Sequence, residues 1–117
     1  MVESILNSVK KLLGITPEYE HFDQDIIMHI NSVFVILNQL GVGPENVYAI
    51  TDASQTWDEF IDDPRINMVK TYMYMKVRLM FDPPTGSVQE AMNRQISELE
   101  WRLNVEVDPG GKNNESI

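Results

Sequence analysis

Apolar residues recur every three or four positions in four parts of this chain, a spacing typical of helices that bury one face. The four parts are residues 5–13, 23–40, 65–81 and 87–104. Glycine and proline residues gather between these parts rather than within them. The pattern therefore predicts a small domain, mainly all-α, with three to four main helices and short connections.

The ends of these helices carry local signals of their own. Asp23 is suited to cap the second helix, and Gly41 is suited to end it. Capping boxes begin at Thr56 and Ser87, so a short helix precedes the third main helix and the last one begins near residue 87. Pro83 ends the third helix, because proline has no amide hydrogen and restricts the residue before it.

Three segments lack the helical spacing. Residues 47–51 are rich in β-formers, which leaves a lone strand and a packed loop as alternatives, and residues 105–107 alternate like a strand. We therefore expect up to two short extended segments. Residues 109–117 are rich in glycine and asparagine and are expected to form a flexible tail. The predicted organisation is one helical domain, residues 1–108, followed by this tail.

Charge is distributed unevenly along the chain. The net charge is −9, and residues 1–64 hold 11 acidic but only 2 basic side chains, whereas residues 65–117 hold 7 of each. A protein that grips a duplex needs lysine and arginine against the phosphates. Two interpretations of the acidic half remain open: simple solubility, and a surface past which DNA slides without sticking.

The third main helix has a second apolar stripe besides the one expected to face the core. The residues of this second stripe are Met68, Tyr72, Met75 and Leu79. This stripe suits either a central helix packed on both sides or a helix with one face against a neighbouring subunit. The polar positions of the helix before Asp82 include Lys70, Lys76 and Arg78 but no acid, which favours an acidic partner, either residues 52–63 or another subunit. In the last helix, Trp101 lies opposite the core stripe, a position typical of interface aromatics. The candidate contact residues are Tyr72, Met75, Lys76, Arg78, Leu79 and Trp101.

Residues that carry out chemistry are few. The chain has no cysteine and two histidines, and Asp25 precedes His29 by four residues, so an Asp–His pair on one helix face is possible. No spacing matches a calcium loop, a zinc motif, a phosphate-binding loop or a nucleophile with its base. We therefore expect no enzyme activity, catalytic residue, cofactor or metal. The sequence also lacks a long apolar run and a signal peptide pattern. We therefore expect no membrane association, and we expect the protein to be made in the cytoplasm.

Several segments resemble one known family, the phage head–tail connector proteins of long-tailed phages and prophages of Gram-positive bacteria. The resemblance covers about residues 5–107 and depends on the number, order and spacing of its segments rather than on a catalytic signature. The segments that carry it are Ile5 to Asn7, Lys10 to Ile15, His21 to Asp23, Asp25 to Ile27, His29 to Phe34, Leu37 to Pro44, Trp57 to Phe60, Tyr74 to Pro84 and Glu98 to Asn104.

The resemblance implies a helical subunit of a ring beneath the portal at the capsid vertex. Such a ring extends the DNA channel and forms the platform on which the tail attaches. The implied partners are copies of the chain itself, the portal protein and tail-side neck proteins, and DNA passes through without specific binding. The implied location is the neck of the virion, after assembly in the host cytoplasm.

Two other functions fit the sequence. One is another neck protein, a stopper or a tail terminator, although such proteins are usually richer in strands. The other is a small acidic regulatory protein that mimics DNA, which the charge of residues 1–64 permits. Self-association discriminates the DNA mimic from a connector, because a mimic can act as a monomer or dimer whereas a connector must be able to build a ring.

Overall fold

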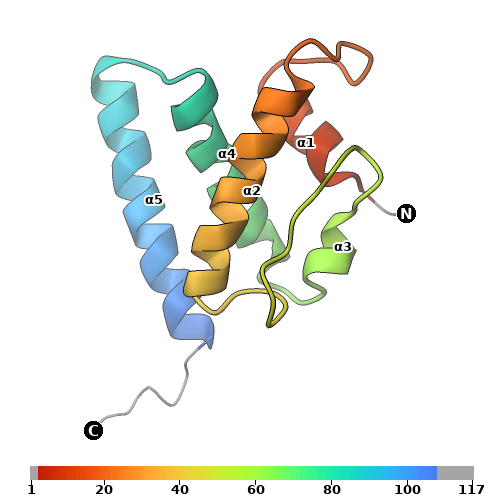
Figure 1. The fold of residues 1–117 in the computed structure, drawn as a ribbon. Coiled ribbons are helices and arrows are strands. Elements are labelled where there is room, and N and C mark those ends of the chain that lie inside the picture. Colours follow the sequence, from red (N-terminus) through yellow and green to blue (C-terminus); the bar gives the residue numbers. More distant parts are fainter. Residues whose placement is uncertain (1–2, 108–117) are drawn as a thin grey trace, which may run out of the picture.

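The computed structural model describes residues 3–107, whose helices surround one central helix (Figure 1). No strand occurs within this range, and a single bridge joins Ser4 to Thr56. The predicted all-α class is confirmed. The helices are α1 (Ile5–Leu12), α2 (Asp23–Gln39), α3 (Trp57–Phe60), α4 (Ile66–Phe81) and α5 (Gly86–Val107).

Most helix ends lie within a residue of their predicted positions, because the signals for them are local. The capping box predicted at Thr56 is formed. The Thr56 side chain accepts a hydrogen bond from the Glu59 amide, and the Glu59 carboxylate accepts one from the Thr56 amide. The prediction that Asp23 caps α2 is wrong. Phe22 holds that position without a side-chain bond, and Asp23 is the first residue of the helix.

The prediction of an extended segment at residues 105–107 is also wrong, because α5 continues as a helix through Val107. Three alternating residues are too few to outweigh a helix that is already propagating, and no strand adjoins them within residues 3–107. The tail predicted at residues 109–117 lies outside the described residues.

Residues 47–51 form a packed loop, the second of the two predicted alternatives. Ile50 is buried, and its backbone is bound by the side chain of Asn31 on α2. The Asn31 amide nitrogen donates to the Ile50 carbonyl at 3.0 Å, and the Ile50 amide donates to the Asn31 side-chain oxygen at 2.8 Å. One side chain therefore supplies the two hydrogen bonds that a neighbouring strand would give.

The central element of the fold is α4. It packs against α2 on one side and α5 on the other, and it also contacts α1 (Figure 1). Val69, Met73 and Val77 of α4 are fully buried. These three residues belong to the stripe expected to face the core. On the second apolar stripe, Tyr72 and Met75 are buried as well, so that stripe is also largely covered within the chain, as expected for a helix packed on two sides.

A hydrogen bond inside the apolar contact between α4 and α5 fixes how these helices meet. The hydroxyl of Tyr72, which is fully buried, donates to Oε2 of Glu100 at 2.7 Å. Burial, and next the bond to this carboxylate, raise the pKa of Tyr72 above its usual range. The phenol therefore stays protonated at neutral pH, as a donor must.

A buried lysine holds the connection between α1 and α2. Lys10 is 1% exposed, and its ammonium donates to the carbonyls of Tyr19 at 2.8 Å and Pro17 at 3.1 Å. It also lies 2.7 Å from Oδ1 of Asp23, an oxygen with no hydrogen bond of good geometry, so this contact is an ion pair. Two hydrogen bonds and one ion pair therefore surround the ammonium group, which compensates for its burial.

We predict that Lys10→Met destabilises the protein by about 2–4 kcal/mol, because it leaves a carboxylate and two carbonyls without their buried partner. Urea unfolding followed by circular dichroism measures the free energy of unfolding. The matched control is Lys11→Met, at an exposed position with no ion pair within residues 3–107, which should change stability by less than about 0.5 kcal/mol. Equal effects of the two substitutions would contradict this role of Lys10.

We also predict that Gly43→Ala destabilises the protein more than Gly14→Ala does. Both glycines have positive φ, 92° and 84°, so each substitution costs about 1–2 kcal/mol of backbone strain. At Gly43 the added Cβ would also collide with the ring of Phe60, whereas at Gly14 it would meet nothing within 4 Å. Thermal unfolding of the two variants checks this order, and a lower melting temperature for Gly14→Ala would refute it.

Candidate functional site

The predicted contact residues fall into two groups in the structure. Tyr72 and Met75 are buried beneath α5, and Leu79 is partly buried against the core. A direct contact of Tyr72 with another subunit would require α4 and α5 to separate. Lys76, Arg78 and Trp101 remain accessible. The structure does not bring the six residues together into one site.

Trp101 is 67% exposed, on the side of α5 that faces away from α4. Figure 1 shows α5 at the edge of the molecule, where it packs mainly on α4. Arg94 and Val105, seven residues before and four residues after Trp101, are exposed as well. The outer face of α5 therefore presents a large aromatic side chain that nothing within residues 3–107 covers.

The basic positions of α4 find few acidic partners inside the chain. Arg78 donates to the Tyr74 hydroxyl at 3.3 Å and to the Asp82 carbonyl at 3.2 Å, and neither acceptor is a carboxylate. Lys76 has no hydrogen bond or ion pair within residues 3–107. Among the acidic residues of the segment 52–63, Asp63 pairs with Arg65 at 2.8 Å.

A second accessible face, on α2, was missed from the sequence. Met28 is 67% exposed and Val35 is 43% exposed, and Asp25 and Ser32 lie on the same side of the helix. The signal was present, since these positions lie off the buried stripe of α2. An apolar residue outside the core stripe of a helix is the same signal that singled out Trp101.

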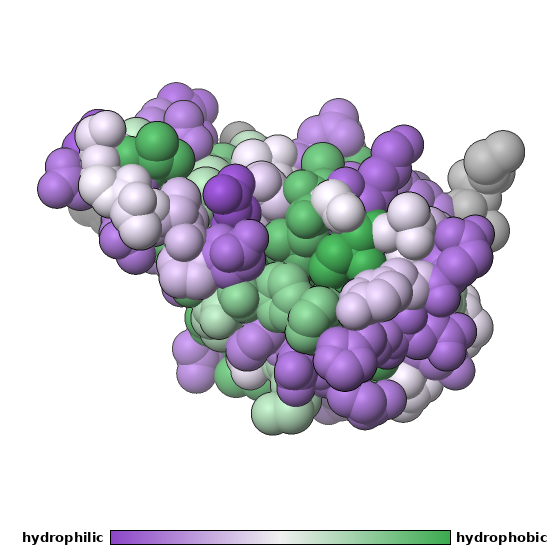
Figure 2. All heavy atoms as spheres, turned by 90° about the horizontal axis from the view of Figure 1, so that it is seen from above, coloured by the Kyte–Doolittle hydropathy of each residue, from purple (hydrophilic) through white to green (hydrophobic). Residues whose placement is uncertain are grey.

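An apolar patch occupies one end of the molecule. Figure 2 shows it from above, surrounded by polar side chains. Exposed apolar side chains on helix ends include Leu12 of α1, Met80 of α4 and Val88 of α5. Exposed apolar surface of this kind, bordered by polar residues, is typical of sites where another protein binds.

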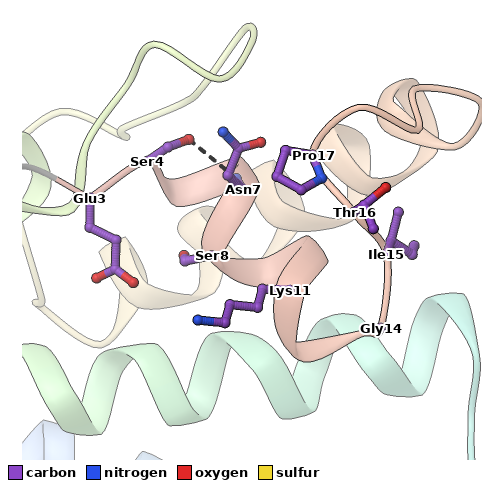
Figure 3. A pocket seen from close by; sticks show the side chains of 9 residues that line it. All are labelled: Glu3, Ser4, Asn7, Ser8, Lys11, Gly14, Ile15, Thr16 and Pro17. Atoms are coloured by element: carbon purple, nitrogen blue, oxygen red, sulfur yellow. Dashed lines mark hydrogen bonds between the residues drawn. The ribbon is translucent and has the colours of Figure 1, made fainter.

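A hollow beside α1 has a volume of about 660 Å³ (Figure 3). Its lining surface is mainly apolar, and its two charged residues are Glu3 and Lys11. Glu3 is engaged in an ion pair with Lys70. The hollow brings together no acid with a histidine, so its lining has no general acid–base pair of that kind.

The histidines are placed among aromatic rings. The His21 ring lies 4.8 Å from that of Phe22, and the His29 ring lies 6.5 Å from that of Phe81. The Asp25–His29 pair that the spacing allowed is not hydrogen-bonded. Within the described range, no three histidine or acidic side chains are grouped as metal ligands. No helix of residues 3–107 has the length and apolar character to cross a membrane.

Comparison with known proteins gives one match. A family model described as "Phage connector protein" matches residues 5–110, which is most of the chain. No curated protein and no solved structure shows significant similarity to this chain. The family match agrees with the helical fold and with the segments that carried the resemblance. The chain belongs to the phage connector protein family, a family of structural phage proteins, and is a component of the virion.

Proposed function

We propose that this chain is one subunit of a ring that docks on the portal, extends the DNA channel and forms the platform for tail attachment. The observation that carries this proposal is the family match over residues 5–110. The match spans every helix of the fold rather than one motif, so the whole domain is the connecting unit.

The distribution of apolar surface supports assembly. The core is already closed by α1, α2, α4 and α5, yet Trp101 and Met28 remain two-thirds exposed on different faces. Tryptophan is enriched at the energetic centres of protein interfaces. A subunit with two different contact faces joins its copies head to tail, the arrangement that closes into a ring.

The charge of the chain supports passage of DNA without capture. Residues 1–64 hold 11 acidic and 2 basic side chains, and of these two bases Lys10 is buried. Few basic side chains of this half are therefore available to displace counterions from phosphate. A conduit of such subunits would bind DNA weakly, as a channel that DNA must traverse requires.

We predict that the purified protein, mixed with the portal protein of the same phage, forms a ring stacked on the portal ring. Negative-stain electron microscopy of the mixture checks this, with portal alone as the control for the added density. A chain that stays unassembled both alone and with portal, under conditions where the portal ring is intact, would refute the proposed function.

We also predict that reversing charge at Lys76 and Arg78 weakens ring formation, because these side chains have no carboxylate partner inside the chain. Lys76→Glu combined with Arg78→Glu should lower the assembled fraction in sedimentation velocity, most strongly at low salt. Lys11→Glu, at an exposed position on α1, changes the net charge as much as Lys76→Glu or Arg78→Glu alone, so it is the charge control for these two single variants. Unchanged ring formation by the double variant at low salt would show that α4 contributes no charge to the contact.

A further inference from the structure

The exposed side chains of α5 form a line along its outer face. Arg94, Trp101 and Val105 are spaced by seven and four residues, so they lie above one another on one side of the helix. Trp101 projects from the middle of this line and is 67% exposed. Arg94 has no hydrogen bond or ion pair with any part of the chain that the structure describes.

A matching line follows the outer face of α2. Met28 and Val35 are both exposed, and Ser32 lies between them. The Ser32 hydroxyl donates to the Met28 carbonyl at 3.0 Å, so this small side chain is held against its own helix and its donor is already satisfied. The result is a shallow depression at Ser32, between two apolar side chains, in which the hydroxyl donor needs no water as its acceptor.

We propose that these two faces bind each other between copies of the chain, with Trp101 of one copy packed on Ser32 between Met28 and Val35 of the next. This proposal rests on the proposed ring and identifies the surfaces that build it. In this contact the flat Trp101 ring would lie over a small residue, beside the thioether of Met28 and the branched side chain of Val35. Such packing buries apolar surface of both partners.

The spacing along the two helices supports one particular register. Arg94 precedes Trp101 by seven residues, and Asp25 precedes Ser32 by seven, which is about 10.5 Å along each helix. With the helices parallel and Trp101 opposite Ser32, Arg94 therefore comes opposite Asp25. Asp25 has no ion pair within residues 3–107, so the contact would neutralise two unpaired charges of opposite sign.

The opposite orientation loses this match. If the helices were antiparallel, Arg94 would face the region of Gln39, where α2 has no acid. In the parallel arrangement Val105 also comes beside Val35, because both lie about one turn beyond the central contact. Charge and apolar contacts thus favour the same direction.

The direction agrees with the geometry of a ring. In Figure 1 α2 and α5 run in the same direction, and α4 runs back between them. Rotation about an axis along these helices preserves their direction, so α5 of one copy meets α2 of the next in parallel. The two faces differ, as a closed head-to-tail ring requires.

The absence of cysteine from the chain allows a direct test. A tagged Ser32→Cys variant and an untagged Ser97→Cys variant are mixed, with portal and without it, and treated with a short linker that joins two thiols. Ser97 is exposed one turn before Trp101 on the outer face of α5, so Trp101 itself is kept. A linker suits the test because packed helix axes lie about 8–10 Å apart, beyond the usual reach of a disulfide. A link between tagged and untagged copies can form only between subunits.

The expected result is a tagged–untagged dimer for this pair and little product for a control that replaces Ser32→Cys with Glu45→Cys, at an exposed loop position off the α2 face. Equal yields for the two pairs would overturn the proposed contact. Rings that form on portal without the Ser32–Ser97 link would overturn this contact while the proposed function stands. No assembly in either condition would overturn both.

A charge exchange tests the register independently. Arg94→Glu alone and Asp25→Arg alone should each reduce ring formation, and the variant with both substitutions should recover it, because each copy again offers opposite charges across the contact. Trp101→Ala should weaken assembly by at least about tenfold, as expected for an aromatic at the centre of an interface. Both charge positions are exposed, and circular dichroism confirms that each variant is folded. Failure of the exchange to restore assembly would overturn the register.

Discussion

The arrangement of this protein depends on one constraint: α4 is apolar on two sides and must be covered on both. Val69, Met73 and Val77 are buried on one side, and Tyr72 is buried on the other beneath α5. No single helix can cover both faces, so α2 and α5 must lie on opposite flanks of α4. The Tyr72–Glu100 hydrogen bond then places a polar pair inside the contact of α4 with α5, where it is satisfied only in one alignment of the helices.

That constraint also explains where free surface remains. Because α5 packs mainly on α4, most of its circumference faces solvent, and Trp101 lies on that part. The connection between α1 and α2 packs Leu13, Ile15 and Phe22 against the core and is also held by the buried ammonium of Lys10. The molecule thus uses its apolar residues at the centre and on its outer faces, and a charge where the chain turns.

Helices were predictable from sequence because their signals are local. Spacing of apolar residues locates each helix, and residues such as Thr56 begin one through bonds to their own neighbours. Burial of Tyr72 was not predictable, because it depends on which helix covers α4, a tertiary fact that periodicity does not contain. The exposure of Trp101 was predictable, since its position opposite the core stripe of α5 needs no knowledge of the other helices. The same logic applied to Met28 would have found the second face.

The exposed faces of α2 and α5 affect how a connector subunit can avoid aggregation and still bind its neighbours. Single apolar side chains on charged surfaces cost little in solution and do not form a continuous patch that aggregates. In the proposed contact each would become effective only when a complementary face meets it in register, where the charges of Arg94 and Asp25 favour one alignment over its alternatives. The proposed ring would repeat this contact many times, so that a weak contact between two copies would give a stable closed assembly. Specificity in such an assembly would come from the spacing of side chains along α2 and α5 rather than from a catalytic group.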